Sequence, residues 1–116
     1  MPAKRTDGNA VDVVANATLE KDTPVFLQGF HGFVQDRCVS GDKVALDISG
    51  AVWEFAVPSG LTAPKGAVLY ISTDGNHTID DAEGAGLVPF CVVVEPKDSN
   101  NIVWAKHLPQ GQPVGA

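Results

Sequence analysis

The chain has 116 residues, of which 44% are hydrophobic, a length and composition that suit one folded domain. Its 14 acidic and 8 basic residues give a formal net charge of -6, which argues against nucleic-acid binding because such binding is carried chiefly by clustered Lys and Arg. No apolar leader region opens the chain, and no stretch approaches the roughly 20 apolar residues that cross a bilayer. We therefore expect neither secretion nor membrane insertion.

Short apolar runs separated by Gly, Pro, Asp, Asn and Ser recur along the chain, and no segment has the pattern of a long amphipathic helix. This rhythm predicts an all-β domain. The predicted strands are Val11 to Ala15, Pro24 to Gln28, Lys43 to Ile48, Ala51 to Val57, Ala67 to Ser72, Leu87 to Glu95 and Ile102 to Ala105.

The chain divides into a polar N-terminal arm, residues 1–9, a β-rich body, residues 10–108, and a C-terminal tail, residues 109–116. The tail is too rich in Gly and Pro for regular structure, and we expect both ends to be flexible extensions. The arm has no apolar periodicity, but it carries Lys4 and Arg5 in an otherwise acidic protein. It is the segment we expect to become ordered on binding.

Alternation of apolar and polar residues predicts that Lys43 to Ile48 covers the core with one face. After the Ser49-Gly50 turn, Trp53 and Phe55 share a face of the next predicted strand, and both are expected in the core or in a subunit contact. These two strands are predicted to form a hairpin.

Pro58 and Pro64 interrupt the next segment, so residues 59–65 are predicted to form a loop. The turn-forming run Asp74-Gly75-Asn76 predicts a second hairpin. The nearly continuous apolar run from Leu87 to Glu95 predicts a strand buried on both faces, with Pro89 at its start or at a bulge. That strand and Ile102 to Ala105 are predicted to form the closing hairpin.

Aromatic residues and cysteines are expected mainly in the core. Free Cys behaves as a small hydrophobic residue, so Cys38 and Cys91 are interpreted as buried thiols, with a disulfide left open. Ordinary core packing is the expectation for each ring of an aromatic set. That set is Phe26, Phe30, Phe33, Trp53 and Trp104.

No residue pattern in this chain predicts catalysis or a bound cofactor. An acidic group resembles the start of a calcium loop, but Ile79 stands where such a loop requires Gly, so a solvated turn is favoured. That group is Asp74, Asn76, Asp80, Asp81 and Glu83. The scattered His31, His77 and His107 have no zinc-ligand spacing and are expected at the surface or as caps.

Nucleophile-elbow and phosphate-loop motifs are absent from the sequence. A small enzyme using Asp80 and Asp81 would need a turn that brings the two carboxyl groups together, and a cleft that raises the pKa of one of them. We therefore predict that the protein is not an enzyme and that it has no catalytic, cofactor-binding or metal-binding residues.

The order of turns and strands resembles the capsid cement, or decoration, proteins of tailed bacteriophages, roughly from Gly8 to Leu108. The segments that carry the resemblance are Gly8 to Ala15, Asp22 to Val25, Gly29 to Val34, Ser40 to Leu46, Gly50 to Phe55 and Gly66 to Tyr70. The resemblance implies a small β-barrel or β-tulip-like domain that binds the outside of an assembled phage head, commonly as a homotrimer. It also implies that the domain reinforces contacts between subunits of the major capsid protein.

On this interpretation the protein is made in the host cytoplasm and is located on the outer capsid surface of the virion. The arm is then the candidate capsid-binding segment, through Ala3, Lys4, Arg5, Thr6 and Asp7. An arm of this kind can add a strand to an exposed sheet edge of the shell. The alternative is a stand-alone β-type carbohydrate- or receptor-binding module, in which Trp53, Trp104 or Tyr70 would stack on the ligand.

Overall fold

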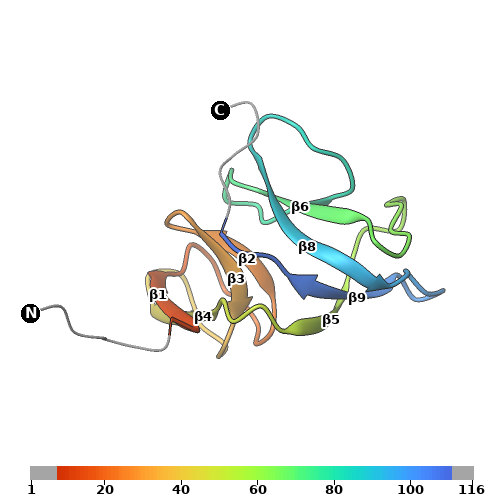
Figure 1. The fold of residues 1–116 in the computed structure, drawn as a ribbon. Helices are drawn as coiled ribbons and strands as arrows, with labels where there is room; N and C mark the ends of the chain where they lie inside the picture. Colours follow the sequence, from red (N-terminus) through yellow and green to blue (C-terminus); the bar gives the residue numbers. More distant parts are fainter. Residues whose placement is uncertain (1–7, 111–116) are drawn as a thin grey trace, which may run out of the picture.

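A computed structural model describes residues 8–110 of the chain, and within that range the protein is all-β, with strands and connecting turns and no helix (Figure 1). The predicted fold class is confirmed. The strands are β1 (Ala10–Val14), β2 (Pro24–Leu27), β3 (Phe30–Val34), β4 (Lys43–Asp47), β5 (Val52–Ala56), β6 (Val68–Ser72), β7 (Ile79–Asp80), β8 (Leu87–Glu95) and β9 (Ile102–His107).

The strands form two antiparallel sheets, one in the order β1-β4-β3-β2 and the other in the order β5-β9-β8-β6-β7. Figure 1 shows the four-stranded sheet curled at one end of the molecule, with the longer strands β8 and β9 extending away from it. The curl brings the two outer strands of this sheet together, since the amide of Val14 at the end of β1 donates to Gln28 Oε1 at 2.9 Å. The small sheet therefore forms a half-barrel.

Strand β3 was not among the predicted strands, because its turn and its middle are unusual. Gln28 and Gly29 connect β2 to β3 with φ angles of 50° and 89°, the two positive values that a tight type I′ hairpin requires. Within β3, a Cβ on Gly32 would lie 2.7 Å from the carbonyl oxygen of Asp47. Glycine at this position thus permits the close approach of β3 and β4.

The predicted hairpin between β4 and β5 is wrong. Strand β4 pairs with β1 and β3, whereas β5 pairs with β9 in the other sheet. Gly50, at a φ angle of 82°, lies where the chain crosses between the sheets. The crossing lets the apolar face of β5 pack against the first sheet, where Trp53 stacks on Phe33 with ring centroids 4.3 Å apart.

The two later hairpins are confirmed: β6 pairs with β7 across the Asp74 turn, and β8 pairs with β9. The register of β8 shifts at Phe90, next to Pro89, so the predicted bulge is also confirmed. The prediction that β8 is buried on both faces was wrong, because buried residues alternate with half-buried ones along most of the strand. The outer face of β8 is only partly covered.

Two hydrophobic clusters hold the structure together, and each has its own set of buried side chains. One fills the half-barrel and includes Val25 and Leu46; the other lies between the sheets around Phe33 and Phe90. The loop predicted for residues 59–65 is present, and it places Leu61 and Ala63 in the second cluster. Both cysteines are buried and free, as interpreted from the sequence: Cys38 lies in the first cluster and Cys91 in the second.

Candidate interaction surfaces

The predicted capsid-binding residues, Ala3, Lys4, Arg5, Thr6 and Asp7, lie outside the described residues. The expected tail begins at Pro109, and Gln110 is the last described residue. Gln110 is tied to strand β3, because its side chain accepts from the backbone amide of His31 at 2.8 Å and donates to the carbonyl of His31 at 2.7 Å. The side chain of Gln110 thus holds this end of the described chain against β3.

An exposed tryptophan lies on the outer face of β9. Trp104 is 49% exposed, and its register partners are Glu54 on β5 and Glu95 on β8, both exposed. Glu54 lies directly opposite Trp104 and therefore projects from the same face. Glu95 is opposite Trp104 at a register shift in β8 and lines a hollow together with the indole, so a carboxylate lies on each side of the ring. We call Glu54, Trp104 and Glu95 the tryptophan face.

Two shallow hollows adjoin the indole of Trp104, one on each side. The first is lined by Glu95, Pro96, Asp98, Ile102 and Trp104. The second is lined by Val52, Trp53, Glu54 and Trp104, and Val52 is itself 52% exposed. The tryptophan face therefore combines apolar surface with negative charge, and neither hollow is enclosed.

The aromatic residues divide between core and surface. Phe33 is fully buried and Phe26 and Trp53 are partly buried against the core, as expected, but Phe30 and Trp104 are exposed. The alternation along β9 contains the signal that places Trp104 outside, since its neighbours Val103 and Ala105 are both fully buried.

A buried pair of histidines joins the two sheets, and this corrects the expectation of surface or capping histidines. His31 on β3 is 0% exposed and His107 on β9 is 1% exposed, with His31 Nδ1 and His107 Nε2 2.9 Å apart. Burial lowers the pKa of His31 to about 4, with a smaller contribution from the nearby His107. Burial also lowers the pKa of His107. Both rings are therefore neutral at pH 7, and one donates to the other.

The third histidine, His77, is half-buried and links the same two sheets at another point. Its Nδ1 accepts from the backbone amide of Phe26 on β2 at 3.0 Å, and its Nε2 lies 3.0 Å from Asn16 Oδ1. An Nδ1 that accepts requires the proton on Nε2, which can then donate to the amide oxygen. Burial lowers the pKa of His77, which favours this neutral form.

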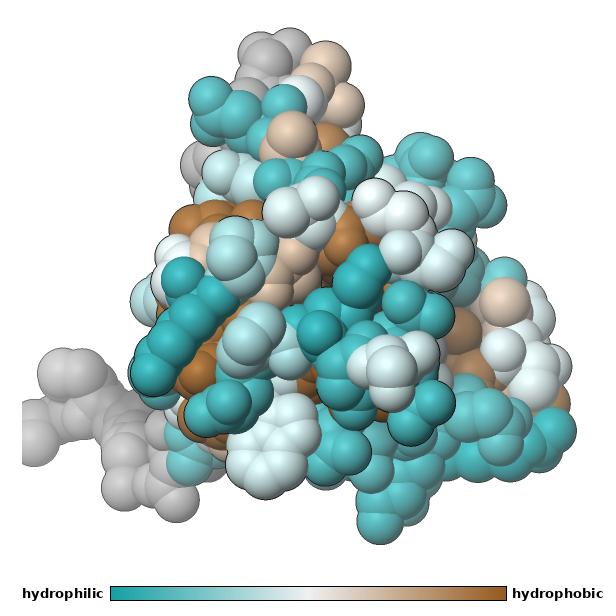
Figure 2. Space-filling view, turned by 90° about the vertical axis from the view of Figure 1, so that its right-hand side faces the viewer, coloured by the Kyte–Doolittle hydropathy of each residue, from teal (hydrophilic) through white to brown (hydrophobic). Residues whose placement is uncertain are grey.

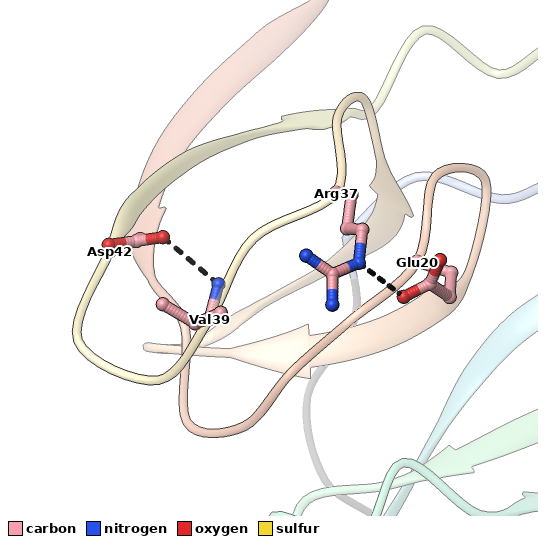
Figure 3. Close-up of polar contacts among 4 residues, drawn as sticks. All are labelled: Glu20, Arg37, Val39 and Asp42. Carbon is pink, nitrogen blue, oxygen red and sulfur yellow. Dashed lines mark hydrogen bonds and ion pairs between the residues drawn. The ribbon is translucent and has the colours of Figure 1, made fainter.

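Polar contacts also order the two loops at the outer end of the half-barrel (Figure 3). Arg37 Nε donates to Glu20 Oε2 at 2.9 Å, and the amide of Val39 donates to Asp42 Oδ2 at 2.9 Å. Both side chains of the ion pair are largely exposed, so it adds at most about 1 kcal/mol. These loops form a polar end of the half-barrel.

No group of three or more His, Cys, Asp or Glu side chains within residues 8–110 is placed to hold a metal ion. In the acidic turn, Asp74 accepts from the Ser72 hydroxyl and from the amide of Asn76, as expected of a local turn.

Residues 8–110 contain no helix that is long and apolar enough to span a membrane. On the face shown in Figure 2, polar and neutral side chains predominate, with apolar side chains visible between them.

Comparison with known proteins identifies the family. Residues 5–106 match the phage cement protein family, and no curated protein matches the chain. The family is one of structural phage proteins associated with the capsid, which is not an enzyme class. Since the match spans nearly the whole β-rich body and part of the arm, the chain belongs to the phage cement protein family.

Proposed function

We propose that this protein binds the outer surface of an assembled phage head and stabilises contacts between subunits of the major capsid protein. The observation that carries the proposal is the family match over residues 5–106. A cement role requires a stable body with complementary surfaces and no reacting groups. The protein is made in the host cytoplasm and joins heads that have already assembled.

The alternative of a stand-alone carbohydrate- or receptor-binding module has less support. Such a module needs exposed aromatic side chains that stack on a ligand. Trp53 stacks on Phe33 and Tyr70 is half-buried, which leaves Trp104 as the exposed member of the three aromatic residues considered. The cement role is therefore the function we propose.

The arm makes the contact with the shell in this proposal, through Ala3, Lys4, Arg5, Thr6 and Asp7. Added as a strand at an exposed sheet edge, the arm gains backbone hydrogen bonds that do not depend on the identity of its side chains. An exposed ion pair made by Lys4 or Arg5 adds at most about 1 kcal/mol. Binding then rests mainly on the backbone of the arm.

A homotrimer would strengthen this weak single contact. Once one arm is bound, the other two bind at a high effective concentration, and overall avidity can rise by roughly 10² to 10⁴.

The net charge of -6 is consistent with a protein partner, since clustered positive charge would be needed to hold nucleic acid.

Proline substitutions in the arm test the backbone contact. Successive residues of a strand direct their N–H groups to opposite edges, so either Ala3→Pro or Thr6→Pro removes a donor that faces the shell. The proline variant that loses this donor should co-sediment with undecorated heads markedly less than the parent chain. Ala3→Ser and Thr6→Ser, which keep the N–H, should co-sediment normally. Parent chain that fails to pellet contradicts the function, and equal pelleting of both proline variants contradicts the arm mechanism.

A further inference from the structure

We propose that the basic pair of the arm, Lys4-Arg5, binds the tryptophan face of a neighbouring copy of the chain. In this contact the Arg5 guanidinium lies over the Trp104 indole between the carboxylates of Glu54 and Glu95. The contact links copies to one another and is separate from the binding of the shell.

The chemistry of the face selects a cation. An aromatic ring attracts a cation to its face, and this attraction is strongest for indole. Glu54 is opposite the indole in regular register, and Glu95 is opposite it at the register shift of β8, so negative charge lies on both sides of the ring. A planar guanidinium can stack on the ring and donate to carboxylates at its edge, which suits Arg better than Lys.

Charge complementarity points to the arm as the occupant. Several cations of the body are already engaged with their own copy: Arg37 with Glu20, Lys43 with Asp12, and Lys97 with two backbone carbonyls. Lys106 lies two residues after Trp104, on the same face of β9, and it donates to the carbonyl of Gly50. The sequence places two of its eight basic residues next to each other in the arm.

The position of β1 favours a neighbouring copy over the same copy. Figure 1 places β1 at one end of the molecule, in the four-stranded sheet, whereas Trp104 lies on β9 in the other sheet, toward the β8–β9 turn. Arg5 stands three residues before Gly8, the first described residue, so its Cα lies at most about 11 Å from the Cα of Gly8. With so short a reach, Arg5 is better placed to meet the tryptophan face of an adjacent molecule than that of its own copy.

This contact is compatible with strand addition to the shell. Strand addition uses the backbone groups of the arm and leaves its side chains directed above and below the new strand. Arg5 can therefore meet a neighbouring copy while the backbone pairs with the shell. Each arm would then connect the shell to two copies of the cement protein.

The test uses a synthetic peptide of residues 1–9 and, as receptor, the full chain carrying Lys4→Glu and Arg5→Glu. Trp104 emission reports binding, and the Trp104→Phe receptor gives the background from Trp53. We expect a saturable change in emission that weakens as salt is raised from about 0.05 M to about 0.5 M. Glu54→Lys and Glu95→Lys together should weaken binding of this peptide about tenfold or more.

Charge exchange provides the rescue. A peptide carrying Lys4→Glu and Arg5→Glu should bind a receptor that combines Glu54→Lys and Glu95→Lys with the original arm, and it should not bind the receptor with the original face. The matched control is Asp36→Lys with Glu83→Lys, which makes the same change in net charge at exposed acids outside the face and should leave binding of the original peptide unchanged.

Three results would overturn the inference. The first is unchanged Trp104 emission at saturating peptide, and the second is equal binding by the face variant and the Asp36, Glu83 control. The third is a difference in emission between the parent chain and its arm variant in samples that sedimentation shows to be monomeric, because this would place the arm on its own copy. A contact between copies should appear only in the oligomer.

Discussion

The buried histidines are the residues whose role departs most from their sequence context. His31 and His107 are 76 positions apart, and neither has a neighbouring ligand-type residue that would predict a pair. Their contact arises because β3 and β9 face each other across the interface between the sheets. Sequence spacing cannot predict this contact without the relative placement of the two sheets.

Because His31 and His107 are buried as neutral rings, we expect the free energy of unfolding to fall in mild acid. With its pKa at about 4, His31 stays neutral in the folded protein, whereas the unfolded chain takes up a proton below its ordinary value of 6.5. Its contribution is complete above pH 6.5 and is lost between 6.5 and 4, by roughly 3 kcal/mol. His107 and His77 act in the same direction. The free energy of unfolding, measured by denaturant titration at several pH values, should fall across this window.

Substitution separates the contribution of His31 from those of the other groups. His31→Gln should flatten the dependence of unfolding free energy on pH between 6.5 and 4, even if the variant is less stable at pH 7. The matched variant His77→Gln should retain most of the dependence. An unchanged pH profile in His31→Gln would show that the buried ring does not resist protonation.

At the scale of elements, alternation predicted strand existence better than strand partners. The runs that became β4 and β5 were recognised, but their pairing was wrong because the aromatic face of β5 packs against Phe33 of the opposite sheet. Strand β3 was missed because Gln28-Gly29 and Gly32 weaken its strand pattern. The hairpins β6–β7 and β8–β9 were predicted correctly because turn residues separate each pair of strands by a short connection.

Substitution of Gly32 tests whether β3 and β4 approach each other closely at this position. A methyl group at Gly32 would meet the Asp47 carbonyl oxygen at 2.7 Å and Ile48 Cγ2 at 3.1 Å, so the backbone must shift. Gly32→Ala should therefore lower the free energy of unfolding by about 1–3 kcal/mol, measured by chemical denaturation. The control is Gly60→Ala, where nothing lies within 4 Å of the added Cβ. Equal stability of the two variants would contradict the close approach of the strands.

At the scale of the whole molecule, the all-β class and the cement family were predicted from the order of turns and strands. The tryptophan face was not, because whether an aromatic residue on a strand points inward or outward depends on which face of the sheet is covered. In the described structure the inner face of β9 is buried through Val103 and Ala105, which leaves Trp104 outside. Alternation separates Trp104 from Val103 and Ala105, but which of the two faces is covered becomes clear only when the two sheets are placed together.

The most direct test of the cement role is the heat resistance of phage heads. DNA release from undecorated heads would be followed during heating, with and without saturating amounts of the purified protein. The bound protein should raise the temperature of half-release, since a ligand that binds the assembled shell stabilises it. Protein that saturates the heads and leaves this temperature unchanged would contradict the proposal that it stabilises contacts between capsid subunits.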